Sequence, residues 1–431
     1  MNELCFEVEW EQVDGSRGDE LAATWARLAI RVGGATITQV KDYRSYGLRD
    51  RILIPLYPLA EWIATHWWSL LYEVQAPGRD GYERRHNLRF GREGFALPDL
   101  FIKPTGERAL IEWRALELPE ARVGFSAGGT RDLELASIRD SLSDLIETVL
   151  ARLDQQGVTD TGLHQEWRAI QAADEAEAAF CRAAARLGQD PYDLSESEAG
   201  AILAAANRLP AGWQDDFFDV ANARELEAQV ALIDDARALL RRSPGPFDGL
   251  VALRGRTEKI DPHRTPWEQG YQVARTLRHR LDLGADPLNS DTALAEAFGI
   301  ASLGCVSVND SRGKRLFDAM VDTADGGRPG FLTTKSRPEQ VRFAFCRGLF
   351  EYLTAPGTPS ALVTVARTDR QKCNRAFAAE FLAPAEWLRE RIDGSQVSPD
   401  EMDDWAQELG VSTVVVGHQI ENHRLAEVAG F

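Results

Sequence analysis

The feature that most constrains this chain is a pair of helical segments in its last third. Residues 342–353 read RFAFCRGLFEYL, and residues 371–384 read QKCNRAFAAEFLAP. The first segment has the amphipathic spacing of a helix, with apolar residues three and four positions apart. Its aromatic residues favour partial burial, although Arg347 and Glu351 lie one turn apart on the same helix. We therefore expect two helices, the first with charged side chains on a partly buried face.

A longer stretch, residues 265–425, resembles the ImmA/IrrE family of bacterial zinc peptidases. The resemblance is strongest in RFAFCRGLFEYL, in NRAFAAEFLAP and in ELGVSTVVVGHQIENH. Such peptidases use an HExxH-type helix, in which two His at i and i+4 share the zinc ion and the Glu acts as general base. The resemblance places the first His at Arg347, the Glu at Gly348, the second His at Glu351 and the third ligand at Gln371.

None of these four residues can do the chemistry that the resemblance assigns to its position. Arg347 has no free lone pair, Gly348 has no side chain, and the amide of Gln371 is a poor zinc ligand. We therefore expect no catalytic residue, no metal and no cofactor here. Arg347 and Glu351 are predicted to pair with each other where the zinc ion would sit. The alternative is a surface ion pair of little energetic consequence.

The resemblance then implies a pseudoenzyme that binds rather than cuts. Active members of the family act on regulators in stress response and on mobile elements. By analogy we expect a regulatory, sensing or scaffolding role through a protein partner, in stress response or phage defence.

Composition narrows the class of protein further. With 49 basic and 67 acidic residues, the net charge of −18 disfavours nucleic acid as a partner. The five cysteines are scattered and form no CxxC pair, which indicates reduced thiols. The N-terminus lacks the pattern of a signal peptide, and no apolar run is long enough to cross a bilayer. We expect a cytoplasmic protein with no membrane partner.

The length of 431 residues exceeds what one hydrophobic core usually supports. Strand-like runs such as LCFEVEW, ARLAIRVGG and YERRHNLRF alternate with one helix in residues 1–128, whereas residues 129–249 are rich in Ala, Glu and Leu and read as helical. The fold class expected is α+β and multidomain. Its parts are an α+β N-terminal domain at 1–128, a helical middle domain at 129–249 and a degenerate zincin-like domain at 250–431.

A second candidate site lies in PDLFIKPTGERALIEWRA, residues 98–115. Asp99, Glu112 and Arg114 resemble the pattern of metal-dependent nucleases of the PD-(D/E)xK class, in which an Asp and a Glu on adjacent strands hold Mg²⁺ and a Lys follows two residues later. Here Arg114 replaces the Lys, and Arg is permanently charged and rigid. The segment predicts either such a nuclease or a structural hairpin that turns at KPTGE.

Two further motifs carry weaker signals. GFSAG, residues 124–128, matches the GxSxG pattern around Ser126, but the expected strand-to-helix order around it is missing, so we interpret it as a loop. DDWAQELGVSTVVVGHQIENHR, residues 403–424, predicts a helix-turn-helix with Gly410 in the turn. Residues 385–431 hold ten acidic against three basic residues, which opposes docking of this segment on DNA. A DNA-binding regulator is therefore only an alternative.

Overall fold

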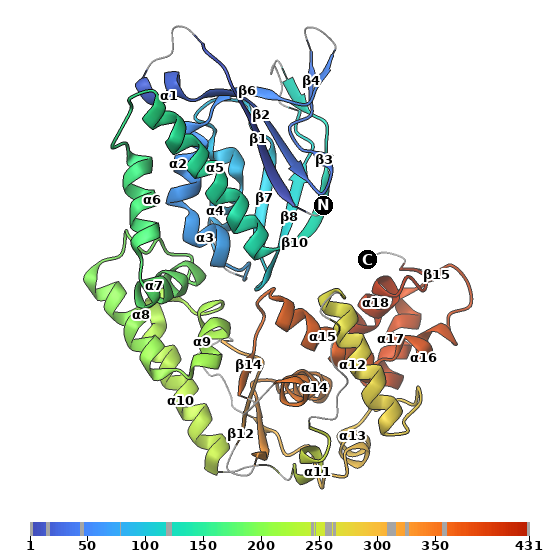
Figure 1. Cartoon of the computed structure of the whole chain (residues 1–431). Coiled ribbons are helices and arrows are strands. Elements are labelled where there is room, and N and C mark those ends of the chain that lie inside the picture. Colours follow the sequence, from blue (N-terminus) through green and yellow to red (C-terminus); the bar gives the residue numbers. More distant parts are fainter. Residues whose placement is uncertain are drawn as a thin grey trace. The chain divides into compact units, whose positions relative to one another are not determined.

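The computed structural model describes the chain except at residues 1–2, 14–17, 44–46, 78, 118–122, 243–244, 246, 255–260, 262–263, 308–315, 324–326, 356–359 and 429–431. The chain divides into two compact units, Met1–Leu203 and Ala204–Phe431 (Figure 1). Each unit has a hydrophobic core of its own. Both contain helices and small, mostly antiparallel sheets, which confirms the expected α+β class in its coarse form.

The first unit begins with an antiparallel sheet. β1 (Leu4–Trp10) pairs with β2 (Trp25–Val32), which also pairs with β3 (Ala35–Thr36) and β6 (Ile52–Pro55). Leu28, Ile30 and Val32 alternate along β2 and are at most 1% exposed. Their spacing of two places every second side chain on the core face. The two strands expected at LCFEVEW and ARLAIRVGG are thereby confirmed.

A second antiparallel sheet has the strand order β10-β8-β7. Its strands are β7 (Asp99–Pro104), β8 (Arg108–Arg114) and β10 (Gly129–Glu134). A third sheet joins β4 (Val40–Asp42), β5 (Leu48–Arg49) and β9 (Val123–Phe125). The pairing of β7 with β8 confirms the hairpin expected at KPTGE.

Helices cover the sheets of the first unit and fill its core. They are α1 (Asp19–Ala23), α2 (Tyr57–Thr65), α3 (Trp67–Tyr72), α4 (Tyr82–His86), η1 (Leu88–Arg92), α5 (Leu135–Gln155), α6 (Gly162–Ala172) and α7 (Glu175–Arg186). The strand expected at YERRHNLRF is wrong, because α4 and η1 occupy that segment. Tyr82 and His86 stack one helical turn apart, with ring centroids separated by 4.0 Å. This spacing buries both rings together, which a strand would not do.

The second unit is built around a four-stranded sheet with the order β11-β13-β12-β14. The strands are β11 (Val306–Ser307), β12 (Ala319–Thr323), β13 (Pro329–Thr333) and β14 (Ala361–Val363). β11 runs parallel to β13, and the other pairs are antiparallel. Helix α14 (Pro338–Thr354) packs on one face, against β12, β13 and β14. On the other face, Leu240 of α10 (Leu226–Arg242) packs against Gly330 of β13.

Helix α15 (Asp369–Leu382) joins α14 to the remaining helices of the second unit. It crosses α12 (Pro266–Arg280) closely at Gly270, where an added Cβ would lie 2.8 Å from the Cβ of Ala376. The other elements are α9 (Ala211–Phe218), η2 (Ala223–Glu225), α11 (Asp248–Val251), α13 (Asp291–Ala297), α16 (Ala385–Arg389), β15 (Gln396–Val397), α17 (Pro399–Leu409), α18 (Thr413–Asn422) and β16 (Glu427–Val428). The expected helix pair with Gly410 in its turn is thus present, as α17 and α18.

The contacts divide the expected middle segment, residues 129–249, between the two units. α5 packs on β1 and β10 of the first unit, whereas α9 and α10 pack on β14 and β13 of the second. The boundary falls inside α8 (Glu196–Arg208). Helices that look alike in composition are therefore separated by the sheets against which they bury their apolar faces.

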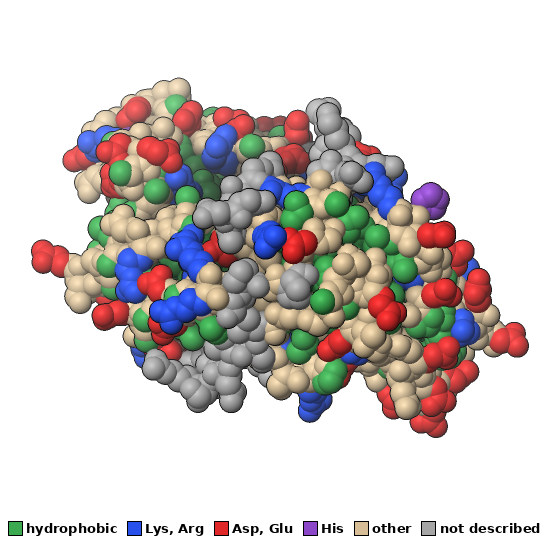
Figure 2. All heavy atoms as spheres, turned by 90° about the horizontal axis from the view of Figure 1, so that it is seen from below, with side chains coloured by type: hydrophobic (Ala, Val, Ile, Leu, Met, Phe, Trp, Pro, Cys, Tyr) green, Lys and Arg blue, Asp and Glu red, His purple; other side chains and the backbone are tan. Residues whose placement is uncertain are grey.

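Charged side chains of both signs lie on the face of the molecule drawn in Figure 2. On the face in Figure 2, acidic and basic side chains of the described residues are interspersed, and acidic ones gather towards the right-hand end of the view. No helix in the described part of the chain is both long and apolar enough to cross a membrane.

Candidate functional site

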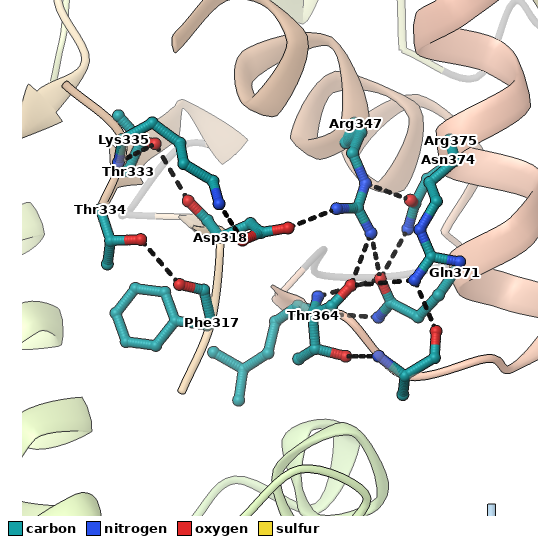
Figure 3. A network of polar contacts seen from close by, with 12 residues as sticks. Phe317, Asp318, Thr333, Thr334, Lys335, Arg347, Thr364, Gln371, Asn374 and Arg375 are labelled. Atoms are coloured by element: carbon teal, nitrogen blue, oxygen red, sulfur yellow. Dashed lines mark hydrogen bonds and ion pairs between the residues drawn. The ribbon is translucent and has the colours of Figure 1, made fainter. Parts of the chain in front are cut away.

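Arg347 is the centre of a buried polar network on α14 (Figure 3). Its side chain donates to Asp318 Oδ2 and to the Thr364 carbonyl oxygen, both at 2.7 Å, and to Gln371 Oε1 at 2.8 Å. Its Nε donates to Asn374 Oδ1 at 2.7 Å. The residue is only 3% exposed. A buried guanidinium is stable only with such a complete set of partners, so Arg347 is a structural part of this core.

Asp318 supplies the negative charge that Arg347 needs. It directly precedes β12, and its backbone is fixed by Val363, whose carbonyl oxygen accepts from the Asp318 amide at 2.7 Å. Lys335 also forms an ion pair with this carboxylate. Burial alone would raise the pKa of Asp318, but the two cations hold it below the ordinary value. Asp318 is therefore ionised and balances much of the positive charge around it.

Glu351, one turn after Arg347, has different partners from those expected. Its Oε2 accepts from Arg370 Nε at 2.8 Å, and its Oε1 accepts from Asn374 Nδ2 at 2.8 Å. The predicted ion pair between Arg347 and Glu351 is wrong, and so is the alternative of a surface pair, because both residues are buried and bonded to others. The side chain of Asn374 lies between them and bonds to both.

Gln371 joins the same network from the first turns of α15. Its Oε1 accepts from Arg347 and from the Thr364 amide at 3.0 Å. Its Nε2 donates to the Leu362 carbonyl oxygen at 2.9 Å and to Asp216 Oδ1 at 3.0 Å. Both ends of the amide are thus occupied. Arg347, Glu351 and Gln371, three of the positions marked by the sequence, meet around Asn374.

Gly348 does not belong to this group. A Cβ added there would lie 2.8 Å from Val321 Cγ2 and 3.2 Å from the ring of Phe331. The position therefore points at the sheet under α14, where a larger side chain would meet the apolar Val321 and Phe331 at once. A Glu at this position could not reach a site at Arg347 without a shift of the helix.

The residues present do not fit a zinc ion. Arg347 offers no lone pair, and the oxygens of Glu351 and Gln371 already accept hydrogen bonds within the network. Among the described residues, no three His, Cys, Asp or Glu side chains are grouped so that they could hold a metal ion. These side chains instead form hydrogen bonds that connect α14 to α15 and to the strands of the sheet.

A cavity of about 530 Å³ opens beside the network. Its apolar wall comes from α12, α14, α15 and α18 and includes Trp267, Tyr271, Phe343, Ala379, Val414 and Val415. Its charged lining consists of Asp318, Lys335, Glu339, Arg347, Lys372 and Arg375. The volume is in the range of small-molecule binding sites.

The second candidate site lies in the first unit, on the hairpin of β7 and β8. Asp99 is directly opposite Arg114, and Phe101 is opposite Glu112, so all four side chains share one face of the sheet. Glu112 accepts from Lys103 Nζ and from Arg114 Nε, each at 2.6 Å. Burial raises the pKa of Glu112, but these two cations outweigh burial and hold the pKa below its ordinary value.

Asp99 accepts from Asn87 Nδ2 at 2.9 Å. Both carboxylates of the proposed nuclease pattern are therefore engaged by nitrogen donors of the chain. Ser126 of GFSAG lies between β9 and β10, in a loop with no following helix, and lacks the geometry of a nucleophile elbow.

Sequence reasoning missed several members of the polar network. Asn374 and Arg375 follow Gln371 by three and four residues, so the helical period could have placed them near it. Asp318 and Asp216 carry no local signal, because only the pairing of β12 with β14 and the packing of α9 bring them there.

Comparisons of this chain with family models, with curated proteins and with solved structures found no match. Any inference about function therefore rests on the geometry of the site and on the resemblance seen in the sequence.

Proposed function

We propose that this chain is a catalytically inactive, ImmA/IrrE-type peptidase-like protein that acts by binding. The observation that carries the proposal is the network around Arg347. Three positions that the resemblance assigns to metal ligands are Arg347, Glu351 and Gln371, and they lie in one hydrogen-bonded cluster. At the position that the resemblance assigns to the first zinc ligand, this chain has a guanidinium. A guanidinium in place of that ligand supports the proposal that the fold is retained while the reaction is lost.

The role proposed for such a protein is regulatory, sensing or scaffolding, through a protein partner. The cavity beside Arg347 supports it, because a site with no catalytic group still offers a shaped and charged surface. Stress response or phage defence follows only from the analogy with the family.

Elemental analysis of the purified, tag-free protein expressed with added Zn²⁺ tests the proposal. We expect far less than one zinc per chain. The positive control is a variant with Arg347→His, Glu351→His and Gln371→Glu, which offers three ligands and should bind about one zinc per chain. Gly348 is kept, because a side chain there does not fit. Stoichiometric zinc in the natural protein would overturn the proposal, whether or not the control variant folds.

A metal-dependent nuclease remains the second candidate. The observation in its favour is that Asp99, Glu112 and Arg114 share one face of the β7–β8 hairpin. It requires Mg²⁺ to displace Lys103 and Arg114 from Glu112. Mg²⁺-dependent cleavage of DNA or RNA that is lost in both Asp99→Ala and Glu112→Ala would establish it, and cleavage that persists in these variants would exclude this site.

A further inference from the structure

The cavity beside Arg347 differs in charge from the chain around it. Four cationic side chains line it, those of Lys335, Arg347, Lys372 and Arg375, against the carboxylates of Asp318 and Glu339. The whole chain carries a net charge of −18. A local excess of positive charge in an acidic protein is a specific feature, because low-dielectric walls focus its field into the cavity.

Three of the four cations have a carboxylate partner. Arg347 and Lys335 both pair with Asp318, and Lys372 donates to Asp369 Oδ1 at 3.0 Å. These three cations share two carboxylate partners, those of Asp318 and Asp369. Arg375, the fourth cation, is held differently.

Arg375 is half-buried, and its Nη2 donates to two backbone carbonyl oxygens, that of Ala366 at 2.6 Å and that of Thr364 at 3.3 Å. No carboxylate of the described residues forms an ion pair with it. Burial and the neighbouring Arg347 lower the pKa of Arg375 to about 9, although the charge of Asp318 acts against this shift. A guanidinium kept partly out of water without a carboxylate in contact is costly, and a bound anion would remove this cost.

The rest of the cavity is apolar. Trp267 and Val414, which also line it, are 44% and 52% exposed, so part of this apolar lining is open to solvent. Phe343 and Ala379, two further lining residues, are partly buried. A ligand that satisfies both parts needs a negative head for Arg375 and an apolar body for the wall.

We propose that this cavity binds a small amphipathic acid, whose carboxylate or phosphate head is held by Arg375 and whose apolar body packs between α12, α14 and α18. The proposal rests on the proposed function, since it names the class of ligand for the same site. The planar fork of the guanidinium matches two oxygens of either head group. The ligand would then be the signal that a non-catalytic sensor reads.

Isothermal titration calorimetry on the full-length protein tests this with three probes. They are 3-phenylpropionate, 2-phenylethyl phosphate and the neutral 3-phenylpropanamide. We expect saturable 1:1 binding of at least one oxyanion, with the amide at least about 10-fold weaker. A difference between the two oxyanions identifies the head group. No saturable binding of either one up to about 10 mM overturns the proposal, and so does equal affinity for the amide.

Three variants locate the site. Arg375→Gln should weaken oxyanion binding about 10- to 100-fold, and Ala379→Phe should weaken it similarly by filling the wall without a change of charge. Arg280→Gln, at an exposed position of α12 away from the cavity, is the matched control and should bind as the natural protein does. Unchanged affinity in both Arg375→Gln and Ala379→Phe, with native thermal melting, would contradict the assignment.

Zinc content measured on the same preparation separates the two proposals. If the natural protein contains no zinc and binds neither oxyanion, the ligand proposal fails and the proposed function stands. Stoichiometric zinc overturns the proposed function, whatever the calorimetry shows.

Discussion

At the scale of single residues, Arg347 decides what the C-terminal unit can be. Its four hydrogen bonds tie α14 to α15, to the segment after β14 and to Asp318. Removing one partner of a buried ion pair leaves the other charge without compensation in a medium that solvates it poorly.

We predict that Arg347→Met lowers the free energy of unfolding by about 3–5 kcal/mol, because the buried Asp318 then loses one of its two ion-pair partners. Urea denaturation followed by circular dichroism measures the loss. Arg280→Met, at an exposed site, is the control and should change stability by less than about 0.5 kcal/mol. A similarly small effect of Arg347→Met would show that the network contributes nothing to the fold.

The buried Asp216 should make the stability of the protein depend on pH. Burial raises its pKa to about 7 from an ordinary 3.8, although Arg370 acts against this shift. Between those two pH values the folded protein keeps a proton on Asp216 that the unfolded chain releases. The stability that this proton contributes is therefore fully present below about pH 4 and is lost as the pH rises through 7.

The stability of the natural protein relative to Asp216→Asn should therefore fall as the pH is raised from 4.5 to about 8, by at most about 1.4 kcal/mol per pH unit. Urea titrations of both proteins at each pH give the difference. A difference that grows with pH would mean that Arg370 keeps Asp216 ionised and that burial is the smaller effect.

At the scale of elements, the packing of α14 on its sheet depends on a residue without a side chain. Gly348 lets the helix approach Val321 and Phe331. Gly200, in the exposed part of α8, has nothing within 4 Å of an added Cβ. Replacement of glycine by alanine should therefore lower the stability of the protein at position 348 and raise it at position 200.

Gly348→Ala is predicted to destabilise the protein by about 1–3 kcal/mol, since the new methyl group overpacks the core. Gly200→Ala should stabilise it by about 0.5–1 kcal/mol, because alanine favours the helix. Thermal melts of the two variants beside the natural protein measure both. A stabilising Gly348→Ala would show that α14 is not held closely against β12 and β13.

The elements themselves were largely predictable from the sequence. The helices at 342–353 and 371–384, the hairpin at 98–115 and the pair around Gly410 follow from periodicity and turn residues. The true partners of Arg347 and Glu351 were not, because Asp318, Asn374 and Arg370 reach them through tertiary packing. The i, i+4 spacing showed that two charges share a helix face, and it could not show that Asn374 lies between them.

At the scale of the whole molecule, charge argues against nucleic acid as a partner. The net charge is −18, and residues 385–431, which contain α17 and α18, hold ten acidic and three basic residues. The face in Figure 2 mixes both signs of charge. Binding to a phosphate backbone needs a basic surface that releases counterions.

We predict no shift of a random-sequence DNA duplex in gel electrophoresis at about 50 mM or about 200 mM salt, with micromolar protein. Binding that is present at the lower salt concentration and weakens at the higher one would contradict this, and would favour the nuclease or the DNA-binding alternative.

If a guanidinium network stands where a peptidase of this type would hold zinc, zinc should not enter the site even when it is supplied. The most direct test is a crystal of the natural protein grown with Zn²⁺, with diffraction recorded across the zinc absorption edge. We predict no anomalous peak in contact with Glu351 or Gln371 and density for Arg347 bonded to Asp318 and Asn374. An anomalous peak coordinated by Glu351 or Gln371, with Arg347 turned away, would contradict this central claim.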